Sequence, residues 1–267
     1  MLWMEITSER MPDAIKQADG VCLLPMGCME RHGPHLPLGT DQFAVDAVTR
    51  LAAEEEPAVV FPSYYFSQIA EARHCSGTFS LPHELLFKLL RATLEEIARN
   101  GFKKIIIVSG HGGNPNLIGY VLGSLRQERH DYCVYSTSSS QMSDEDRKEL
   151  LAMLKTQSRH AGEVETSSIL ALRPELVHLE DIKDPDSWKP QGRQDGLEGV
   201  SSAFGWYANY PYHYAGDARP ACREVGEFAI AARVRRLVKA IRSVKADEVT
   251  PELQEEFYTR AEHGGLD

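Results

Sequence analysis

Acidic and imidazole side chains are concentrated in a short segment near the N-terminus of this 267-residue chain. They are Glu30, His32, His35 and Asp41. A mostly apolar run, residues 21–26, lies just before them and predicts a buried strand. Taking two carboxylates and two imidazoles out of water costs several kcal/mol unless something compensates, and a divalent cation is the usual compensator. The segment therefore predicts a metal site.

Two further polar clusters have the residue types to complete such a site. His111 lies in a glycine-rich turn, and Glu165 lies in the cluster 160–167 at the start of a predicted helix. The candidate ligands are Glu30, His32, Asp41, His111 and Glu165. A mixed carboxylate–imidazole set favours Zn²⁺, Mn²⁺ or Fe²⁺ over Ca²⁺, and a carboxylate such as Asp41 can bridge two ions.

Each cluster also has another interpretation. The histidines could be satisfied within tight turns whose glycines serve only the backbone. The turn 110–114 could bind a phosphate at a helix N-terminus, although it lacks both the Walker and the GxGxxG spacing. Cys28 could be a thiol nucleophile, but Glu30 close to it would raise the thiol pKa rather than lower it.

The elements that must position these residues alternate between strand and helix patterns. Strands are predicted at residues 20–25, 58–62, 103–109 and 131–137, and helices at 41–54, 80–99, 117–129, 165–172 and 224–244. The unbroken β-branched run in 103–109 is typical of a strand covered on both faces. Strands and helices in alternation predict an α/β fold with a mainly parallel sheet. Ser80 is the predicted N-cap of the second helix.

The chain as a whole narrows the classes of function. A net charge of −10 and a pI near 5.5 argue against a nucleic-acid partner. No stretch reaches the ~18 apolar residues that cross a membrane, and the N-terminus has no signal-peptide pattern. Five cysteines without CxxC spacing suit reduced thiols in a cytoplasmic protein.

Four motifs in order resemble the signature of the creatininase (creatinine amidohydrolase) family. They are Leu24-Pro25-Met26-Gly27 continuing through Glu30–Asp41, residues 76–81 (SGTFSL), residues 110–114 (GHGGN) and residues 160–167 (HAGEVETS). The resemblance covers roughly residues 15–245. It implies a three-layer α/β sandwich with a mainly parallel central sheet, a binuclear metal centre, and a homo-oligomer that is often a hexamer. We expect one such domain over residues 1–267, with a long substrate or interface loop at about 181–214.

Carried over by position, the resemblance implies a role for each candidate ligand. Glu30 and His111 would hold one metal, His32 the other, and Asp41 would bridge them. Two divalent ions, with zinc preferred to manganese or iron, would activate a bridging hydroxide that attacks a substrate carbonyl. His160 matches the family's catalytic histidine and would carry a proton to the leaving group.

The chain departs from true creatininases directly after His111. Those enzymes carry a Tyr-Glu pair there, with the glutamate as a metal ligand, whereas this chain has Gly112 and Gly113. We expect Glu165 to supply the missing ligand and to take part in catalysis. The His-Gly-Gly-Asn form resembles other branches of the family, which argues against creatinine as the substrate.

Several residues outside the motifs are candidates for substrate contact. They are His74, Ser76, Tyr207, Tyr212 and His213. The aromatic run that holds the last three suits a hydroxylated ring, although an oligomer interface would also be rich in Trp and Tyr. Loop polarity alone would equally account for His74.

The predicted function is metal-dependent hydrolysis of a small polar molecule, by default at a C–N bond of an amide or cyclic amide. The main alternative is ring opening of a cyclic ketone derived from an inositol or sugar, with cleavage of a C–C bond. A peptide-trimming maturation protease ranks third, and a non-catalytic metal-binding scaffold ranks last.

Overall fold

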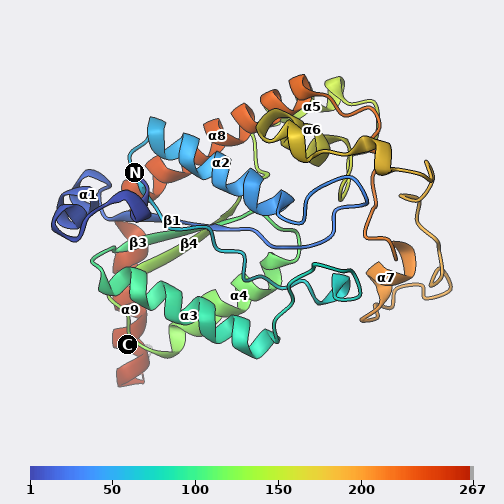
Figure 1. The fold of residues 1–267 in the computed structure, drawn as a ribbon. Coiled ribbons are helices and arrows are strands. Elements are labelled where there is room, and N and C mark those ends of the chain that lie inside the picture. Colours follow the sequence, from blue (N-terminus) through green and yellow to red (C-terminus); the bar gives the residue numbers. More distant parts are fainter. Residues whose placement is uncertain (265–267) are drawn as a thin grey trace.

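The computed structural model describes residues 1–264 and is built around a four-stranded sheet (Figure 1). The strands are β1 (Val21–Met26), β2 (Val59–Val60), β3 (Lys104–Ser109) and β4 (Cys133–Ser138). They lie in the order β2-β1-β3-β4, and every neighbouring pair is parallel. β1 and β3 pair along their whole lengths, from Val21↔Lys104 to Met26↔Ser109. The predicted parallel sheet is confirmed.

Helices cover both faces of this sheet (Figure 1). One face carries α2 (Thr40–Glu55), α5 (Asp144–Met153), α6 (Glu163–Leu172) and α8 (Arg223–Lys245), and the other carries α3 (His83–Arg99) and α4 (Asn114–Ser124). The remaining helices are α1 (Met11–Gln17), α7 (Gly205–Asn209) and α9 (Val249–His263). Short 3-10 turns lie at Trp3–Glu5, Ser8–Arg10, Ala70–Ala72, Leu125–Gln127, Pro174–Leu176 and Leu179–Asp181.

Alternating side chains of the central strands divide the core in two. Leu24 and Ile105 pack with the apolar stripes of α3 and α4. Leu23 and Ile106 point to the opposite face and pack with α2 and α8. Because both of their faces are buried, the central strands β1 and β3 are apolar at nearly every position rather than at every second one. The fold is therefore the expected three-layer α/β sandwich.

Several helix boundaries differ from the sequence predictions. The helix predicted to open at Ser80 begins at His83, and the N-cap position belongs to Pro82, which makes no side-chain cap hydrogen bond. A proline disfavours helical backbone in the residue before it, so the chain stays extended up to Pro82. The helix predicted at 117–129 starts earlier, at Asn114, and its last turn, Leu125–Gln127, is 3-10. The predicted helices at 41–54 and 224–244 each begin one residue early, as α2 and α8.

The long loop expected at about 181–214 has little regular structure. Residues 182–204 form neither helix nor strand, and the single helix that follows in this region is the short α7. α7 packs against the 3-10 turn Ala70–Ala72. In Figure 1 the segment lies beyond the end of the sheet, on the side to which α2 points its N-terminus.

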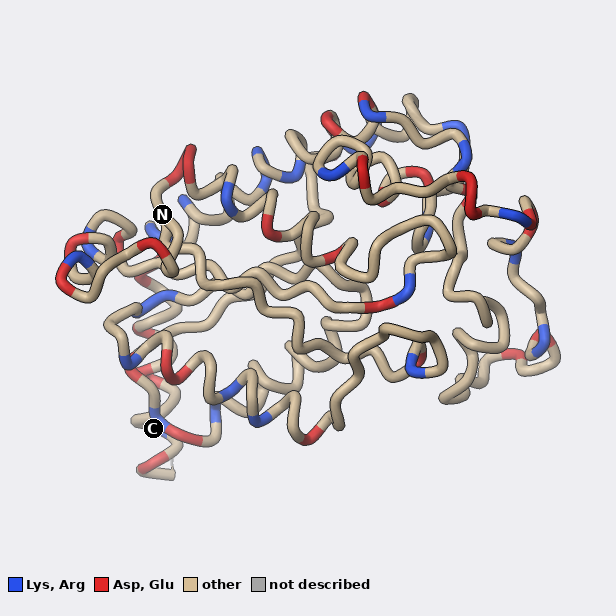
Figure 2. The backbone as a smooth tube through the Cα atoms, viewed as in Figure 1, with Lys and Arg blue, Asp and Glu red and all other residues tan. Residues whose placement is uncertain are grey.

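Charge is mixed over the outside of the molecule. Lys and Arg alternate with Asp and Glu along the outer helices (Figure 2), and the sum is −10. Among residues 1–264 no helix has the length and the apolar content to cross a membrane.

Candidate metal centre

The candidate ligands meet beyond the carboxyl ends of β1 and β3. β2 and β3 flank β1, so the strand order reverses at this point, where α/β sheets commonly bind ligands. The loop after β1 carries Glu30 and His32, and the first turn of α2 carries Asp41. His111 follows β3, and Glu165 lies in the first turn of α6. The structure brings all of these side chains together.

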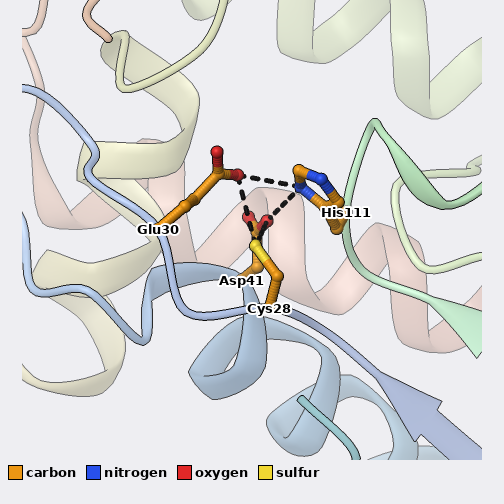
Figure 3. A group of neighbouring side chains, drawn as sticks. All are labelled: Cys28, Glu30, Asp41 and His111. Atoms are coloured by element: carbon orange, nitrogen blue, oxygen red, sulfur yellow. Dashed lines mark hydrogen bonds and ion pairs between the residues drawn. The ribbon is translucent and has the colours of Figure 1, made fainter. Parts of the chain in front are cut away.

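Glu30, Asp41 and His111 form a first cluster (Figure 3). His111 Nδ1 lies 2.8 Å from Glu30 Oε1 and 2.9 Å from Asp41 Oδ2. Its other ring nitrogen, Nε2, lies 2.9 Å from the carbonyl oxygen of Gln68. A carbonyl only accepts hydrogen bonds, so Nε2 carries the proton. In the neutral ring the lone pair of Nδ1 then faces two carboxylate oxygens.

His32, Asp41 and Glu165 form a second cluster. His32 Nδ1 lies 3.3 Å from the backbone carbonyl oxygen of Glu30 and therefore donates to it. His32 Nε2 is buried without a hydrogen-bond partner, 3.2 Å from Asp41 Oδ1 and 3.8 Å from Glu165 Oε2. Asp41 thus presents one carboxylate oxygen to each cluster.

The carboxylates buried in these two clusters need positive charge beside them. Burial alone lowers the pKa of His32, but Asp41 and the neighbouring carboxylates outweigh it and raise the pKa to about 10. The pKa of His111 is raised in the same way, against burial, by Glu30 and Asp41. Burial raises the pKa of Glu165 to about 6. Protons can therefore supply the charge, and a divalent ion supplies it more fully.

The donor set fits divalent metal ions. Both His32 and His111 donate one ring N–H to a backbone carbonyl and turn the other nitrogen toward carboxylates. Histidines that bind metals show this arrangement, because the second hydrogen bond fixes the ring and its tautomer. The cluster residues are almost fully buried, apart from Glu165, whose side chain is 34% exposed. One carboxylate shared by two such groups suits two ions.

Glu165 is held in place by the start of its own helix. Its Oε2 accepts the backbone N–H of Ala161 at 2.6 Å, as an acidic residue in a first helical turn commonly does. Ala161 has φ of 57°, which is unusual for a residue with a side chain. This backbone turn brings its N–H round to Glu165.

Gly113 leaves no room for a side chain beside His111. A Cβ added to Gly113 would lie 2.5 Å from His111 Nε2 and 2.8 Å from the carbonyl oxygen of Gln68. A side chain there would break the hydrogen bond that orients His111. At Gly112, by contrast, an added Cβ would meet nothing within 4 Å.

His160 lies beside the second cluster. Its ring centroid is 4.2 Å from that of His32, and its Nε2 lies 3.0 Å from the carbonyl oxygen of Arg31. Burial, with a contribution from His32, lowers the pKa of His160 to about 3. The ring is therefore neutral, with the proton on Nε2 and a free lone pair on Nδ1.

His213 approaches the centre from the loop after α7. Its Nε2 lies 2.6 Å from Glu30 Oε2, and Trp206 donates its indole N–H to His213 Nδ1 at 2.9 Å. Since indole can only donate, His213 Nδ1 must accept, and Nε2 must carry the proton. His213 therefore donates to Glu30. This fixed tautomer argues against His213 as a further metal ligand.

A cavity of about 360 Å³ opens onto both clusters. Its walls include Glu30, Asp41, His111, His160, Glu165, Trp206 and His213. Among the residues expected to touch substrate, His213 lines this cavity. His74 and Tyr207 line a neighbouring cavity of about 650 Å³, and His74 Nε2 donates to the carbonyl oxygen of Pro211 at 2.8 Å. The structure brings neither Ser76 nor Tyr212 to either cavity, and both are exposed.

A third cavity, of about 450 Å³, adjoins the centre on the β4 side and shares His111 and Glu165 with the first. Hydroxyl and amide groups supply much of its wall: Ser136, Thr137, Ser138, Ser140 and Gln141. Pro115, Ile118 and Leu122 add apolar wall to this space, which therefore offers both hydrogen-bonding and apolar contacts.

Sequence reasoning missed two participants. Cys28 drew notice only as a nucleophile, yet its Sγ lies within 3.3 Å of both Glu30 Oε1 and Asp41 Oδ2. The sequence carried one signal of this contact, because Cys28 lies only two residues before Glu30. Trp206 was noted only as part of an aromatic run, and no sequence pattern links it to a residue 176 positions earlier such as Glu30.

A parallel sheet covered on both faces, with carboxylates and imidazoles clustered beyond its strand ends, defines an α/β enzyme. The chain belongs to the creatininase family, since the family model described as creatinine amidohydrolase matches residues 4–241. A crystal structure of creatinine amidohydrolase (creatininase) has a TM-score of 0.75 and 26% identity, covering 92% of this chain and 98% of that one. Other solved creatininases, with TM-scores of 0.74, are described as a Zn–Zn type and a Mn form.

The similar proteins with assigned activities are hydrolases of different kinds. Creatinine amidohydrolase of Pseudomonas putida is 28% identical over 261 residues, 89% of this chain and 95% of that protein. 3-Dehydro-scyllo-inosose hydrolase of Thermotoga maritima is 26% identical over 256 residues, 90% and 82% of the two chains. Mycofactocin precursor peptide peptidase of Mycobacterium tuberculosis is 31% identical over 170 residues, 59% and 61% of the two chains. These relatives support hydrolysis as the reaction class.

Proposed function

We propose that this protein is a hydrolase with two divalent metal ions that cleaves a C–N bond in a small polar amide or cyclic amide. One observation carries the proposal. In His32 and His111 the ring nitrogen that does not donate to a backbone carbonyl faces an oxygen of Asp41, and each ring faces a different oxygen. A single carboxylate between two oriented imidazoles suits a bridging role between two ions.

The two sets of ligands differ. Glu30, Asp41 and His111 would hold one ion, and His32, Asp41 and Glu165 the other. When bound, the ions would polarise the scissile carbonyl and lower the pKa of the attacking water. Glu165 takes the place of the ligand that the Gly113 loop excludes. Zinc is our first choice, and the zinc and manganese forms of solved creatininases support either metal.

His160 is the proposed proton carrier. Its Nε2–H is engaged with the carbonyl oxygen of Arg31, so the free lone pair is on Nδ1. His160 also lines the cavity that opens onto both clusters. It would take a proton from the attacking water and return that proton to the leaving nitrogen, which leaves the enzyme unchanged after each turnover.

The experiment is a substrate screen with metal-loaded protein and a matched pair of variants. Cyclic amides, formamides, inositol-derived cyclic ketones and short peptides would be compared after loading with Zn²⁺ or Mn²⁺. Asp41→Asn keeps the side-chain shape but removes the bridging charge, so turnover should fall by at least about 100-fold. Glu54→Gln changes an exposed carboxylate of the same helix and should leave turnover unchanged. Absence of bound metal in the wild type, or full activity in Asp41→Asn, would overturn the proposal.

A second reaction is favoured by the cavity on the β4 side. Its hydroxyl groups suit a polyhydroxylated ring, and ring opening of a cyclic ketone would use the same attack on a carbonyl. The relative from Thermotoga maritima supports this alternative. Turnover of cyclic ketones without turnover of amides would establish it. The peptide-trimming reaction ranks below both, because Trp206 and His213 close one side of the cavity.

We also propose a cytoplasmic homo-oligomer, with a hexamer as the first expectation. The five free cysteines support a reducing compartment. An apolar hollow between α3 and α4 supports self-association, and it is lined by Leu86, Phe87, Leu117 and the 70% exposed Tyr120. Light scattering on the purified protein tests the oligomeric state, and a monomer at micromolar concentration would contradict it.

A further inference from the structure

Cys28 lies at the base of the first cluster, under the carboxylates (Figure 3). Its side chain is fully buried. Its Sγ lies 3.3 Å from Glu30 Oε1 and 3.2 Å from Asp41 Oδ2. These are the same two oxygens that His111 Nδ1 approaches at 2.8 and 2.9 Å. The sulfur therefore completes a group of four potential ligand atoms.

Four edges of this group are close in length to those of a tetrahedral zinc site. All four atoms lie within 4.8 Å of one another. In a tetrahedron with Zn–S of about 2.3 Å and Zn–O or Zn–N of about 2.0–2.1 Å, sulfur–oxygen edges are about 3.6 Å and nitrogen–oxygen edges about 3.3 Å. The observed edges are a few tenths of an ångström shorter, at 3.2–3.3 Å and 2.8–2.9 Å. Small side-chain shifts would open the group enough for an ion.

The chemistry of the surroundings also assigns Cys28 to an ion. Cys28 Sγ faces the carboxylate oxygens of Glu30 and Asp41, whose negative charge does not favour a free thiolate nucleophile. A divalent cation reverses this local field, and a coordinating thiol then loses its proton to solvent as the metal–sulfur bond forms. Among residues 1–264, the other four cysteines belong to no such group of potential ligands.

We propose that Cys28 is the fourth protein ligand of the ion held by Glu30, Asp41 and His111, and that this ion is zinc. The inference rests on the proposed metal centre, and it gives the two ions of that centre different types of ligand. Thiolate is a soft ligand that selects zinc over manganese, whereas the second cluster offers only carboxylates and imidazole. Four protein ligands would hold the first ion, and His32, Asp41 and Glu165 would hold the second ion beside His160.

Cobalt substitution tests this assignment directly. Co²⁺ bound by a thiolate gives a charge-transfer band in the near ultraviolet that oxygen and nitrogen ligands do not give. Wild-type protein loaded with Co²⁺ should show the band, and Cys28→Ser and Cys28→Ala should lose it. Cys75→Ser is the matched control, because Cys75 is also buried but belongs to no ligand group. Its band should equal that of the wild type.

Metal competition gives a second readout. Cys28→Ser should weaken binding of the more tightly bound Zn²⁺ ion by roughly 10- to 100-fold. Binding of Mn²⁺ should change little. Wild-type protein that binds two Co²⁺ ions without the band would overturn ligation by Cys28 and leave the metal centre intact. Protein that binds no Co²⁺ at all would overturn both. The wild-type spectrum decides between these results even if a Cys28 variant fails to fold.

Discussion

Replacing Trp206 with phenylalanine isolates one hydrogen bond behind the metal centre. The indole N–H of Trp206 donates to His213 Nδ1 at 2.9 Å, and this bond forces the His213 proton onto Nε2, which faces Glu30 Oε2 at 2.6 Å. Phenylalanine keeps an aromatic ring beside His160 and Tyr210 but removes the donor. His213 can then place its proton on either nitrogen, and one of the two tautomers turns a lone pair toward the Glu30 carboxylate.

The size of the effect follows from the cost of an unpaired buried group. Leaving His213 Nδ1 without a donor costs about 1–3 kcal/mol. Loss of a hydrogen bond behind a metal ligand typically lowers metal affinity or activity by about 10- to 100-fold. We expect Trp206→Phe to weaken binding of the ion at Glu30 by that factor. Binding of the ion at His32 and Glu165 should change less. Titration against a chelator of known affinity measures both ions.

Trp188 provides the control, because its indole nitrogen is buried without a hydrogen-bond partner. Trp188→Phe therefore removes a ring of the same size and no hydrogen bond, and it should retain wild-type metal affinity. Nitrogen-15 NMR of the wild type should show His213 protonated on Nε2. Equal affinities for the two variants, or a His213 protonated on Nδ1, would refute the reasoning.

Two further predictions follow from the same centre. Gly113→Ala should destabilise the protein by about 1–3 kcal/mol and weaken metal binding, because the new Cβ lies 2.5 Å from His111 Nε2, whereas Gly112→Ala should be close to neutral. Thermal unfolding and metal titration of the pair check this, and equal behaviour would contradict it. The pKa of His32 in the folded, metal-free protein is about 10, above its ordinary value of 6.5. The contribution of His32 to the free energy of unfolding is therefore complete below about pH 6.5 and is lost as the pH rises through 10. Denaturant titrations with and without Zn²⁺ measure this loss. It should occur only in the metal-free protein.

The fold was largely predictable because its signals are local. The β-branched run of β3 and the apolar run of β1 indicate buried strands by themselves. Helices with thin apolar stripes were missed: α5 and α9 each bury a single residue, Leu150 and Tyr258. The misplaced start of α3 has a local cause too, since Pro82 ends the extended chain where Ser80 had suggested a cap.

The candidate site was predictable where its residues follow strand ends. Glu30 and His111 each come soon after a central strand, so parallel strand order places them at one edge. The partners behind them were not predictable. His213 contacts Glu30 across 183 positions and Trp206 contacts His213 through a turn, so only the folded chain reveals the pairs. The sequence likewise indicated no difference between the two clusters, because that difference depends on where Cys28 Sγ points.

The distribution of the ligands along the chain has a consequence for biosynthesis. Every side chain of the first cluster has been synthesised once His111 is made, but the second cluster must wait for Glu165. At ~5–20 residues per second the ribosome takes roughly 3–10 s to cover that interval. The candidate ligands of the first cluster are therefore all present in the nascent chain before Glu165 of α6. The helix α8, which packs over α2 and α6, closes this side of the molecule only near the end of synthesis.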